Sequence, residues 1–155
     1  MREIKSVILH CTATTLDKKL TVKEIRKWHV KGNGWADIGY HFVIHQDGTI
    51  ERGRPIGKVG AHTWGNNHGS IGVAYCGGVE KKVLKSMDKE KPKSKTTLVS
   101  KDTMTDAQET SFRNLFKMLE IMFGELKLRG HNDYTSSKDC PSFKVREKFG
   151  DIMEL

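Results

Sequence analysis

Three residues of this sequence have the types and the spacing of a catalytic metal site. His131 begins and Cys140 ends the segment His-Asn-Asp-Tyr-Thr-Ser-Ser-Lys-Asp-Cys, and His10 ends the first apolar run of the chain. Two imidazoles and one thiolate can bind zinc, and three protein ligands leave the fourth tetrahedral position free, whereas structural zinc sites close all four. The set therefore predicts a zinc hydrolase, although His10 taken alone is more typical of a buried core histidine.

The residues before His10 predict the element that would hold it. Residues 4–10 read Ile-Lys-Ser-Val-Ile-Leu-His, which is typical of a largely buried strand that ends at the histidine. Cys11 and Cys76 are expected to be small buried residues in strands. The chain has only three cysteines, and such an odd, sparse count argues against a disulfide framework.

Two capping boxes predict where the main helices begin. Thr21-Val-Lys-Glu24 opens a helix that should end at Gly32, and Thr105-Asp-Ala-Gln108 opens one that should end at Gly124. In the first helix, Trp28 and His29 are expected to pack. A stripe at helical spacing places these residues of the second helix in the core: Phe112, Leu115, Phe116, Leu119 and Met122. Residues 142–149 predict a terminal helix.

The remaining apolar segments predict strands. Residues 40–45 and 50–52 flank an Asp-Gly turn, residues 70–76 form a buried-type strand, and residues 126–130 form a short strand or loop. Alternation along residues 40–45 would put Tyr40 on the same face as Phe42. The element order predicts one α/β domain over residues 1–155, with a central mixed β-sheet flanked by helices.

Most of the net charge lies in one segment. The chain carries +8, and residues 81–101 alone contain eight lysines and two acidic residues. We interpret residues 79–103 as a lysine-rich insertion, part of it a hairpin of residues 79–84 against 96–99. The segment has no aromatic residue to stack on bases, so no nucleic-acid partner is expected. The segment could be a solvent-exposed loop without a function of its own. The functional alternative is that its lysines attract an anionic polymer.

Seven short motifs in this order resemble a known family. They are Ile8-Leu-His-Cys-Thr-Ala-Thr14, Gly39-Tyr-His-Phe42, Gly60-Ala-His62, Gly65-Asn-Asn67, Ser70-Ile-Gly72, Gly77-Gly78 and Lys138-Asp-Cys-Pro-Ser-Phe143. Together they resemble the zinc-dependent N-acetylmuramoyl-L-alanine amidases of the phage-lysozyme type, relatives of the peptidoglycan recognition proteins. The resemblance covers about residues 4–149, and it implies the fold of those recognition proteins.

The resemblance also implies an activity and a set of site residues. Members of the family hydrolyse the amide between the lactyl group of N-acetylmuramic acid and L-alanine in peptidoglycan. Zn²⁺ would be bound by His10, His131 and Cys140, with Tyr40 and Lys138 as catalytic residues and His62, Trp64 and Asn67 in the substrate groove. Without the resemblance, Lys138 would be interpreted as an exposed loop lysine and Tyr40 as a packing aromatic. The spacing from His131 to Cys140 is one residue longer than in familiar relatives, and the lysine-rich insertion is also longer.

Several functional alternatives stay open from the residues. A phage or prophage endolysin is the leading hypothesis, beside a cytoplasmic enzyme that recycles wall fragments, a non-catalytic peptidoglycan-binding module, and a regulator of an intracellular protein partner. Non-catalytic recognition proteins of the family lack the cysteine ligand, so Cys140 favours an enzyme.

No apolar run approaches the roughly 20 residues that span a bilayer. Cleavage of the N-terminus as a signal peptide would remove His10. We therefore expect a protein made in the cytoplasm without a signal peptide that acts on the cell wall. We also expect a monomer.

Overall fold

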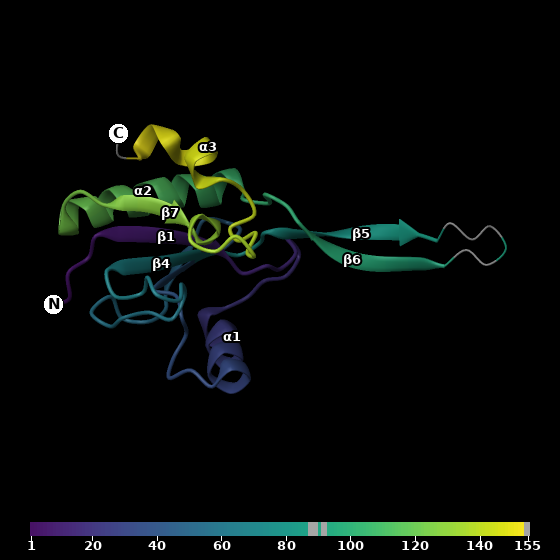
Figure 1. Cartoon of the computed structure of the whole chain (residues 1–155), viewed down its shortest axis with the longest axis horizontal. Helices are drawn as coiled ribbons and strands as arrows, with labels where there is room; N and C mark the ends of the chain where they lie inside the picture. Colours follow the sequence, from purple (N-terminus) through teal and green to yellow (C-terminus); the bar gives the residue numbers. More distant parts are fainter. Residues whose placement is uncertain (87–89, 91–92, 154–155) are drawn as a thin grey trace.

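The computed structural model of the protein describes residues 1–86, 90 and 93–153 (Figure 1). The tip of the predicted insertion, residues 87–89 and 91–92, and the last two residues of the chain lie outside the described residues. The strands are β1 (Ser6–Cys11), β2 (Phe42–Ile44), β3 (Ile50–Arg52), β4 (Ser70–Tyr75), β5 (Val79–Lys85), β6 (Ser94–Ser100) and β7 (Lys127–Gly130). The helices are α1 (Val22–Lys27), α2 (Asp106–Phe123) and α3 (Val145–Phe149), with short helical turns η1 (Trp28–Gly32), η2 (His131–Asp133) and η3 (Gly150–Ile152).

Five strands form one mixed sheet in the order β3-β2-β4-β1-β7. The strands β2, β4, β1 and β7 run parallel, and only β3 is antiparallel to its neighbour. Helices α2 and α3 cover one face of the sheet and α1 lies on the other (Figure 1). The predicted α/β fold with a central mixed sheet is confirmed.

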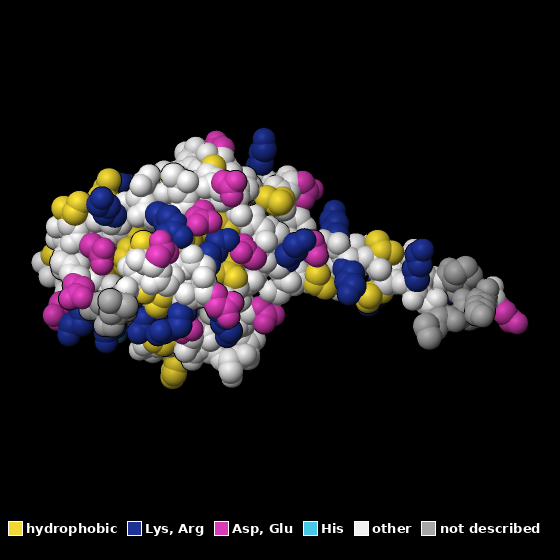
Figure 2. All heavy atoms as spheres, turned by 90° about the horizontal axis from the view of Figure 1, so that it is seen from above, with side chains coloured by type: hydrophobic (Ala, Val, Ile, Leu, Met, Phe, Trp, Pro, Cys, Tyr) yellow, Lys and Arg dark blue, Asp and Glu magenta, His cyan; other side chains and the backbone are white. Residues whose placement is uncertain are grey.

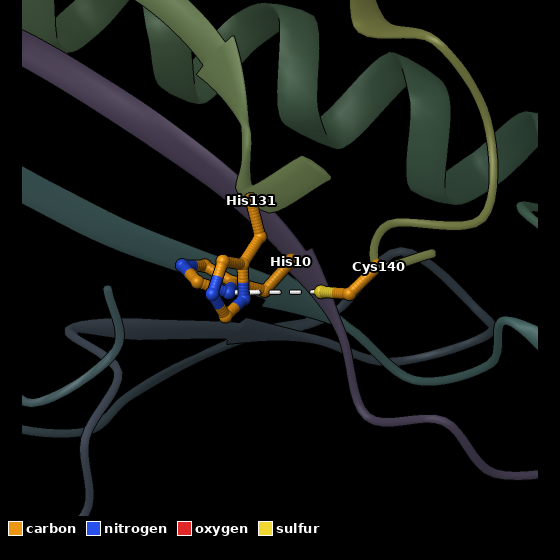
Figure 3. Close-up of side chains that lie close together, drawn as sticks. All are labelled: His10, His131 and Cys140. Carbon is orange, nitrogen blue, oxygen red and sulfur yellow. Dashed lines mark hydrogen bonds between the residues drawn. The ribbon is translucent and has the colours of Figure 1, made fainter. Parts of the chain in front are cut away.

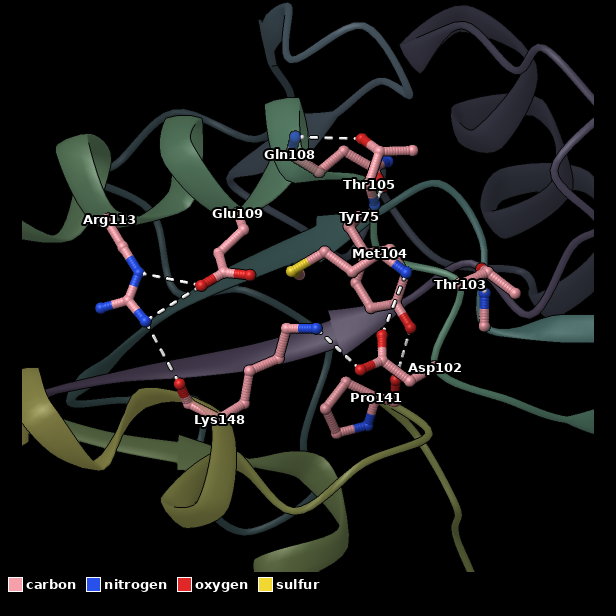
Figure 4. Close-up of polar contacts among 11 residues, drawn as sticks. Tyr75, Asp102, Thr103, Met104, Thr105, Gln108, Glu109, Arg113, Pro141 and Lys148 are labelled. Carbon is pink, nitrogen blue, oxygen red and sulfur yellow. Dashed lines mark hydrogen bonds and ion pairs between the residues drawn. The ribbon is translucent and has the colours of Figure 1, made fainter.

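The two faces of the sheet bury separate apolar cores. Alternation along β1 sends Val7, Leu9 and Cys11 toward α2 and α3, where they pack with the helix α2 stripe. Figure 4 shows polar contacts around α2 and α3, among them Lys148 Nζ donating to Asp102 Oδ2 at 2.7 Å. His10 therefore points away from the larger core, toward the face that carries α1.

Both capping boxes are present as predicted. The hydroxyls of Thr21 and Thr105 accept hydrogen bonds from the backbone N–H of the third residue of each helix. The side chains of Glu24 and Gln108 accept in turn from the backbone N–H of Thr21 and Thr105. The prediction was wrong for Met122, which is 57% exposed. Phe123 packs against the core instead, because it lies closer to the centre of the apolar stripe than Met122 does.

The first predicted helix does not continue regularly to Gly32. Its α-helical part ends at Lys27, and η1 continues the chain as a wider π-turn. Trp28 does not pack as predicted: it is 42% exposed and lies beneath the Lys18 ammonium group. Because β2 begins only at Phe42, alternation does not reach Tyr40, which packs against the smaller core with Val43 rather than on the face of Phe42.

Strands β5 and β6 form a separate two-stranded hairpin, as predicted. We call its described residues, 79–86 and 93–101, the arm. The arm projects from the end of the domain where β1 and β4 finish (Figure 1). None of the helices in the described part of the chain is long and apolar enough to cross a membrane.

Candidate functional site

The ends of two neighbouring parallel strands bring His10 and His131 together. Leu9 of β1 pairs with Gly130 of β7, so the two histidines are the next residues along adjacent strands. Their ring centroids are 4.8 Å apart. Side chains at the carboxyl ends of parallel strands commonly form the sites of α/β proteins, because these ends share one edge of the sheet.

Cys140 reaches the same point from a loop that hydrogen bonds hold in place. Asn132 donates from its backbone N–H to the Cys140 carbonyl at 2.8 Å, and from its side chain to the Phe143 carbonyl at 3.0 Å. The buried Tyr75 hydroxyl donates to the Pro141 carbonyl at 2.7 Å, a bond drawn in Figure 4. The loop is therefore tied to β4 and to η2, which fixes the thiol relative to the two imidazoles.

One potential ligand atom from each of the three residues converges on a small volume (Figure 3). The chosen nitrogens of His10 and His131 and the Cys140 sulfur all lie within 4.8 Å of one another. The His10 Nδ1 atom is 3.7 Å from Cys140 Sγ. Zinc bond lengths of about 2.0 Å to nitrogen and about 2.3 Å to sulfur, at a tetrahedral angle, imply a separation of about 3.5 Å. The donor set thus fits a tetrahedral zinc ion.

The electrostatic environment suits neutral imidazole ligands. Burial lowers the pKa of His10 well below its ordinary value, with further lowering by His62 and His131. Burial, then the Lys138 ammonium, lower the pKa of His131. Both rings therefore stay uncharged near neutral pH, and each keeps a lone pair for a cation. The Cys11 backbone N–H lies 3.2 Å from Cys140 Sγ, where it can donate to a thiolate.

A chain of polar groups fixes the orientation of the His10 ring. His10 Nε2 lies 2.9 Å from His62 Nδ1, and His62 Nε2 lies 3.3 Å from Ser70 Oγ. Ser70 Oγ donates in turn to the Asn66 carbonyl at 2.7 Å. If His10 Nδ1 binds a metal, the Nε2–H of His10 donates to His62. Every donor in this series of hydrogen bonds then has an acceptor. Partners of this kind set the tautomer of a metal ligand.

The three ligand atoms open into a cleft of about 560 Å³. Tyr40 and Lys138 both line it, and the Tyr40 ring centroid lies 5.2 Å from that of His10. Burial raises the pKa of the Tyr40 phenol, with smaller contributions from Cys140 and the other cysteines. The cleft therefore brings both predicted catalytic side chains beside the predicted ligands.

The residues predicted for the substrate groove are spread more widely. His62 lines the cleft but is 8% exposed and is engaged with His10. Asn67 Oδ1 accepts from the backbone N–H groups of His62 and Thr63, each at 2.9 Å, so it shapes the loop. Trp64 is 96% exposed, and neither it nor Asn67 is among the described residues that line the cleft.

Sequence reasoning missed the position of His29 in the cleft. His29 was expected only to pack, yet it lines the cleft, accepts from the Gly39 N–H at 2.8 Å and contacts the Trp35 ring at 4.8 Å. Trp35, whose ring lies beside that of His29, also lines the cleft. The π-turn η1 presents His29 to the cleft, and its break in helical period carries no recognised sequence signal.

Comparison with known proteins agrees with this geometry. The family model described as N-acetylmuramoyl-L-alanine amidase matches residues 1–143. The chain belongs to the N-acetylmuramoyl-L-alanine amidase family. It is 39% identical over 142 residues to the endolysin of Enterobacteria phage T3, covering 92% of this chain and 83% of that protein. It is also 39% identical over 141 residues to the endolysin of Escherichia phage T7, covering 91% and 82%.

Two solved structures superpose on this chain and share its fold. The N-acetylmuramoyl-L-alanine amidase LysC of Clostridium intestinale superposes with a TM-score of 0.72 at 28% identity, over 96% of this chain and 87% of that one. The bumblebee protein PGRP-SA superposes with a TM-score of 0.74 at 24% identity, over 99% and 84%. The predicted family resemblance and the fold that it implied are confirmed.

Proposed function

We propose that this amidase is an endolysin that hydrolyses the amide between N-acetylmuramic acid and L-alanine of peptidoglycan, with zinc bound by His10, His131 and Cys140. The observation that carries the proposal is the convergence of these three ligand atoms within 4.8 Å at the cleft. The family match and the phage endolysin relatives support the reaction class. Acting on the cell wall follows from this activity.

An unactivated amide resists water at neutral pH, so the site must supply both a nucleophile and an electrophile. A zinc ion in this donor set would lower the pKa of a bound water toward 7 and polarise the scissile carbonyl. The protein residues supply what remains. The chain His10, His62 and Ser70 holds the first imidazole in one tautomer, and the Cys11 N–H stabilises the thiolate of Cys140.

We assign the two other polar residues of the cleft to the reacting groups. The Tyr40 hydroxyl orients the attacking water by a hydrogen bond, since its ring lies beside His10 at the wall of the cleft. Lys138 extends from the loop that carries Cys140 and stabilises the negative charge that develops on the carbonyl oxygen. A preorganised donor of this kind contributes roughly 3–4 kcal/mol, or about 10²–10³ in rate.

The test is the release of L-alanine amino groups from purified peptidoglycan. The protein is assayed as purified, after chelation and after zinc is restored. Cys140→Ser is compared with Cys76→Ala, which removes a thiol that is buried and outside the cleft. We expect release that is lost on chelation, returns with zinc, is absent in Cys140→Ser and persists in Cys76→Ala. Full activity of Cys140→Ser, or no release from wall or soluble fragments with zinc bound, would refute the proposal.

A further inference from the structure

The arm is an exposed ribbon with a regular register. Seven residues of β5 pair with seven of β6, from Val79 opposite Ser100 to Lys85 opposite Ser94. At about 3.3 Å per residue the ribbon extends about 20 Å from its base. Figure 2 shows the arm standing clear of the domain, with lysine and apolar side chains along its length. Such a surface offers contacts that the sheet domain does not provide.

The arm is strongly cationic. Residues 79–86 and 93–101 contain six lysines and one glutamate, and the glutamate is already paired, since Lys101 Nζ lies 2.9 Å from Glu80 Oε2. The ion pairs found among described residues include none of the lysines at positions 82, 85, 93 and 95. These four side chains belong to exposed residues. The charge that they carry is therefore available to an anionic partner.

The base of the arm is part of the catalytic cleft. Val79, Leu98 and Ser100 line the same cleft as His10 and Cys140. A second hollow of about 660 Å³ shares Leu98 with the cleft and adds Lys81. Lys81 and Leu98 face each other in the register, so both side chains lie on one face of the ribbon together with Lys85, whereas Lys82 and Lys95 lie on the other face. A ligand that leaves the cleft over Leu98 thus passes directly onto the arm.

Hydrogen bonds fix this base against the Cys140 loop. Ser142 Oγ donates to the Gly78 carbonyl at 2.7 Å, and the Lys101 N–H donates to the same carbonyl at 3.0 Å. The Gly78 N–H donates to Thr103 Oγ at 2.8 Å. Gly78 has φ of 100°, and a Cβ there would collide with the Cys11 side chain, so only glycine fits. The arm therefore leaves the domain in a direction that is set at the site itself.

We propose that the arm extends the substrate groove and binds the acidic stem peptides of polymeric peptidoglycan next to the one being cut. The proposal rests on the amidase function above. Stem peptides carry free carboxylates, and a polymer presents many of them along its length, which complements lysines on both faces of the ribbon: Lys85 on the face of Leu98, and Lys82 and Lys95 on the opposite face. Because the base of the ribbon lines the cleft at Leu98, this contact would fall on the same substrate molecule.

Two other anionic partners fit the arm less well. The described arm has no aromatic side chain on which nucleic-acid bases could stack. Its exposed apolar residues do not form one membrane-facing side, because Val83 and Leu98 lie on one face of the ribbon and Leu84 on the other. Insertion into a lipid surface needs a single apolar face.

The experiment compares a polymeric with a monomeric substrate. The arm variant combines K82Q, K85Q, K93Q and K95Q, none of which lines the cleft. The control variant combines K23Q, K27Q, K117Q and K127Q, which removes the same charge from exposed positions on the domain. Hydrolysis is measured on insoluble wall and on a soluble disaccharide with a single stem peptide, at low and at physiological salt.

For the arm variant we expect KM on the wall to rise about 3- to 10-fold with kcat unchanged, as several weak exposed ion pairs would give. Kinetics on the monomeric fragment should stay unchanged, and the salt dependence of KM on the wall should weaken. An unchanged KM on the wall, or an equal rise in the control variant, would overturn the proposal.

Binding measurements separate this proposal from the proposed function. If the wild-type protein hydrolyses neither substrate, the amidase function fails, and co-sedimentation of C140S with intact wall tests the arm by itself. C140S carrying the four arm substitutions should then bind wall about 3- to 10-fold more weakly than C140S alone. Equal sedimentation would contradict the inference. So would binding of C140S to duplex DNA or to phosphatidylglycerol vesicles as tightly as to wall in the same buffer.

Discussion

Replacement of His62 by alanine separates two roles that one buried side chain could have. As a groove residue, His62 would act on the substrate; as the partner of His10 Nε2 at 2.9 Å, it would act on the metal. Loss of such a partner typically lowers metal affinity or activity by about 10- to 100-fold, which corresponds to about 1.4–2.7 kcal/mol. The contact geometry favours the second role, so we expect zinc affinity to fall by this amount in His62→Ala.

The assay is competition for zinc with a chromophoric chelator, followed by kinetics at saturating zinc. His68→Ala is the matched control, because His68 is an exposed histidine of the same segment. Denaturant unfolding checks that the buried cavity left by His62→Ala has not unfolded the protein. Zinc affinity within about 3-fold of wild type, together with a raised KM for substrate, would refute the positioning role and support a substrate contact.

Four further changes test the remaining assignments. Tyr40→Phe should lower kcat by about 10² or more at unchanged zinc affinity, because it removes only the hydroxyl, and steady-state kinetics with zinc titration measures both. Lys138→Met should lower kcat by about 10²–10³, and normal kinetics would exclude the oxyanion role. Gly72→Ala should weaken zinc binding as His62→Ala does, since its Cβ would lie 2.5 Å from His62 Cδ2; competition with the same chelator would show this. Chelation should lower the thermal midpoint by about 8–16 °C if zinc is present at about a thousand times its Kd, and an unchanged calorimetric midpoint would argue against the site.

Local signals predicted much of the fold because the interactions that they report are local. The capping boxes at Thr21 and Thr105 and the apolar stripe of α2 depend on residues three or four positions apart. The hairpin of residues 79–84 and 96–99 was also predicted, and β5 and β6 extend it by a few residues. The set His10, His131 and Cys140 was proposed from ligand chemistry and from motif order, which do not require a three-dimensional model.

The features that sequence reasoning missed depend on contacts between distant segments. The partnership of His10 and His62 spans 52 positions, and it needs Gly72 to leave space for the second ring. His29 reaches the cleft only because the first helix widens at η1. Tyr40 leaves the face of Phe42 because β2 starts later than alternation implied. In each case, tertiary packing determined a geometry that the local pattern left open.

The Cys140 loop connects the proposed metal site to the arm, and this connection determines how the two can be tested. Ser142 follows two residues after the thiol and donates to Gly78, from which β5 departs. A substitution at the arm base would therefore disturb both the ligand and the ribbon, and its effect on activity could not be assigned. The lysines at positions 82, 85, 93 and 95 lie beyond that base and outside the cleft lining. Removal of these charges should weaken binding of the polymer while leaving the reaction at His10, His131 and Cys140 unchanged.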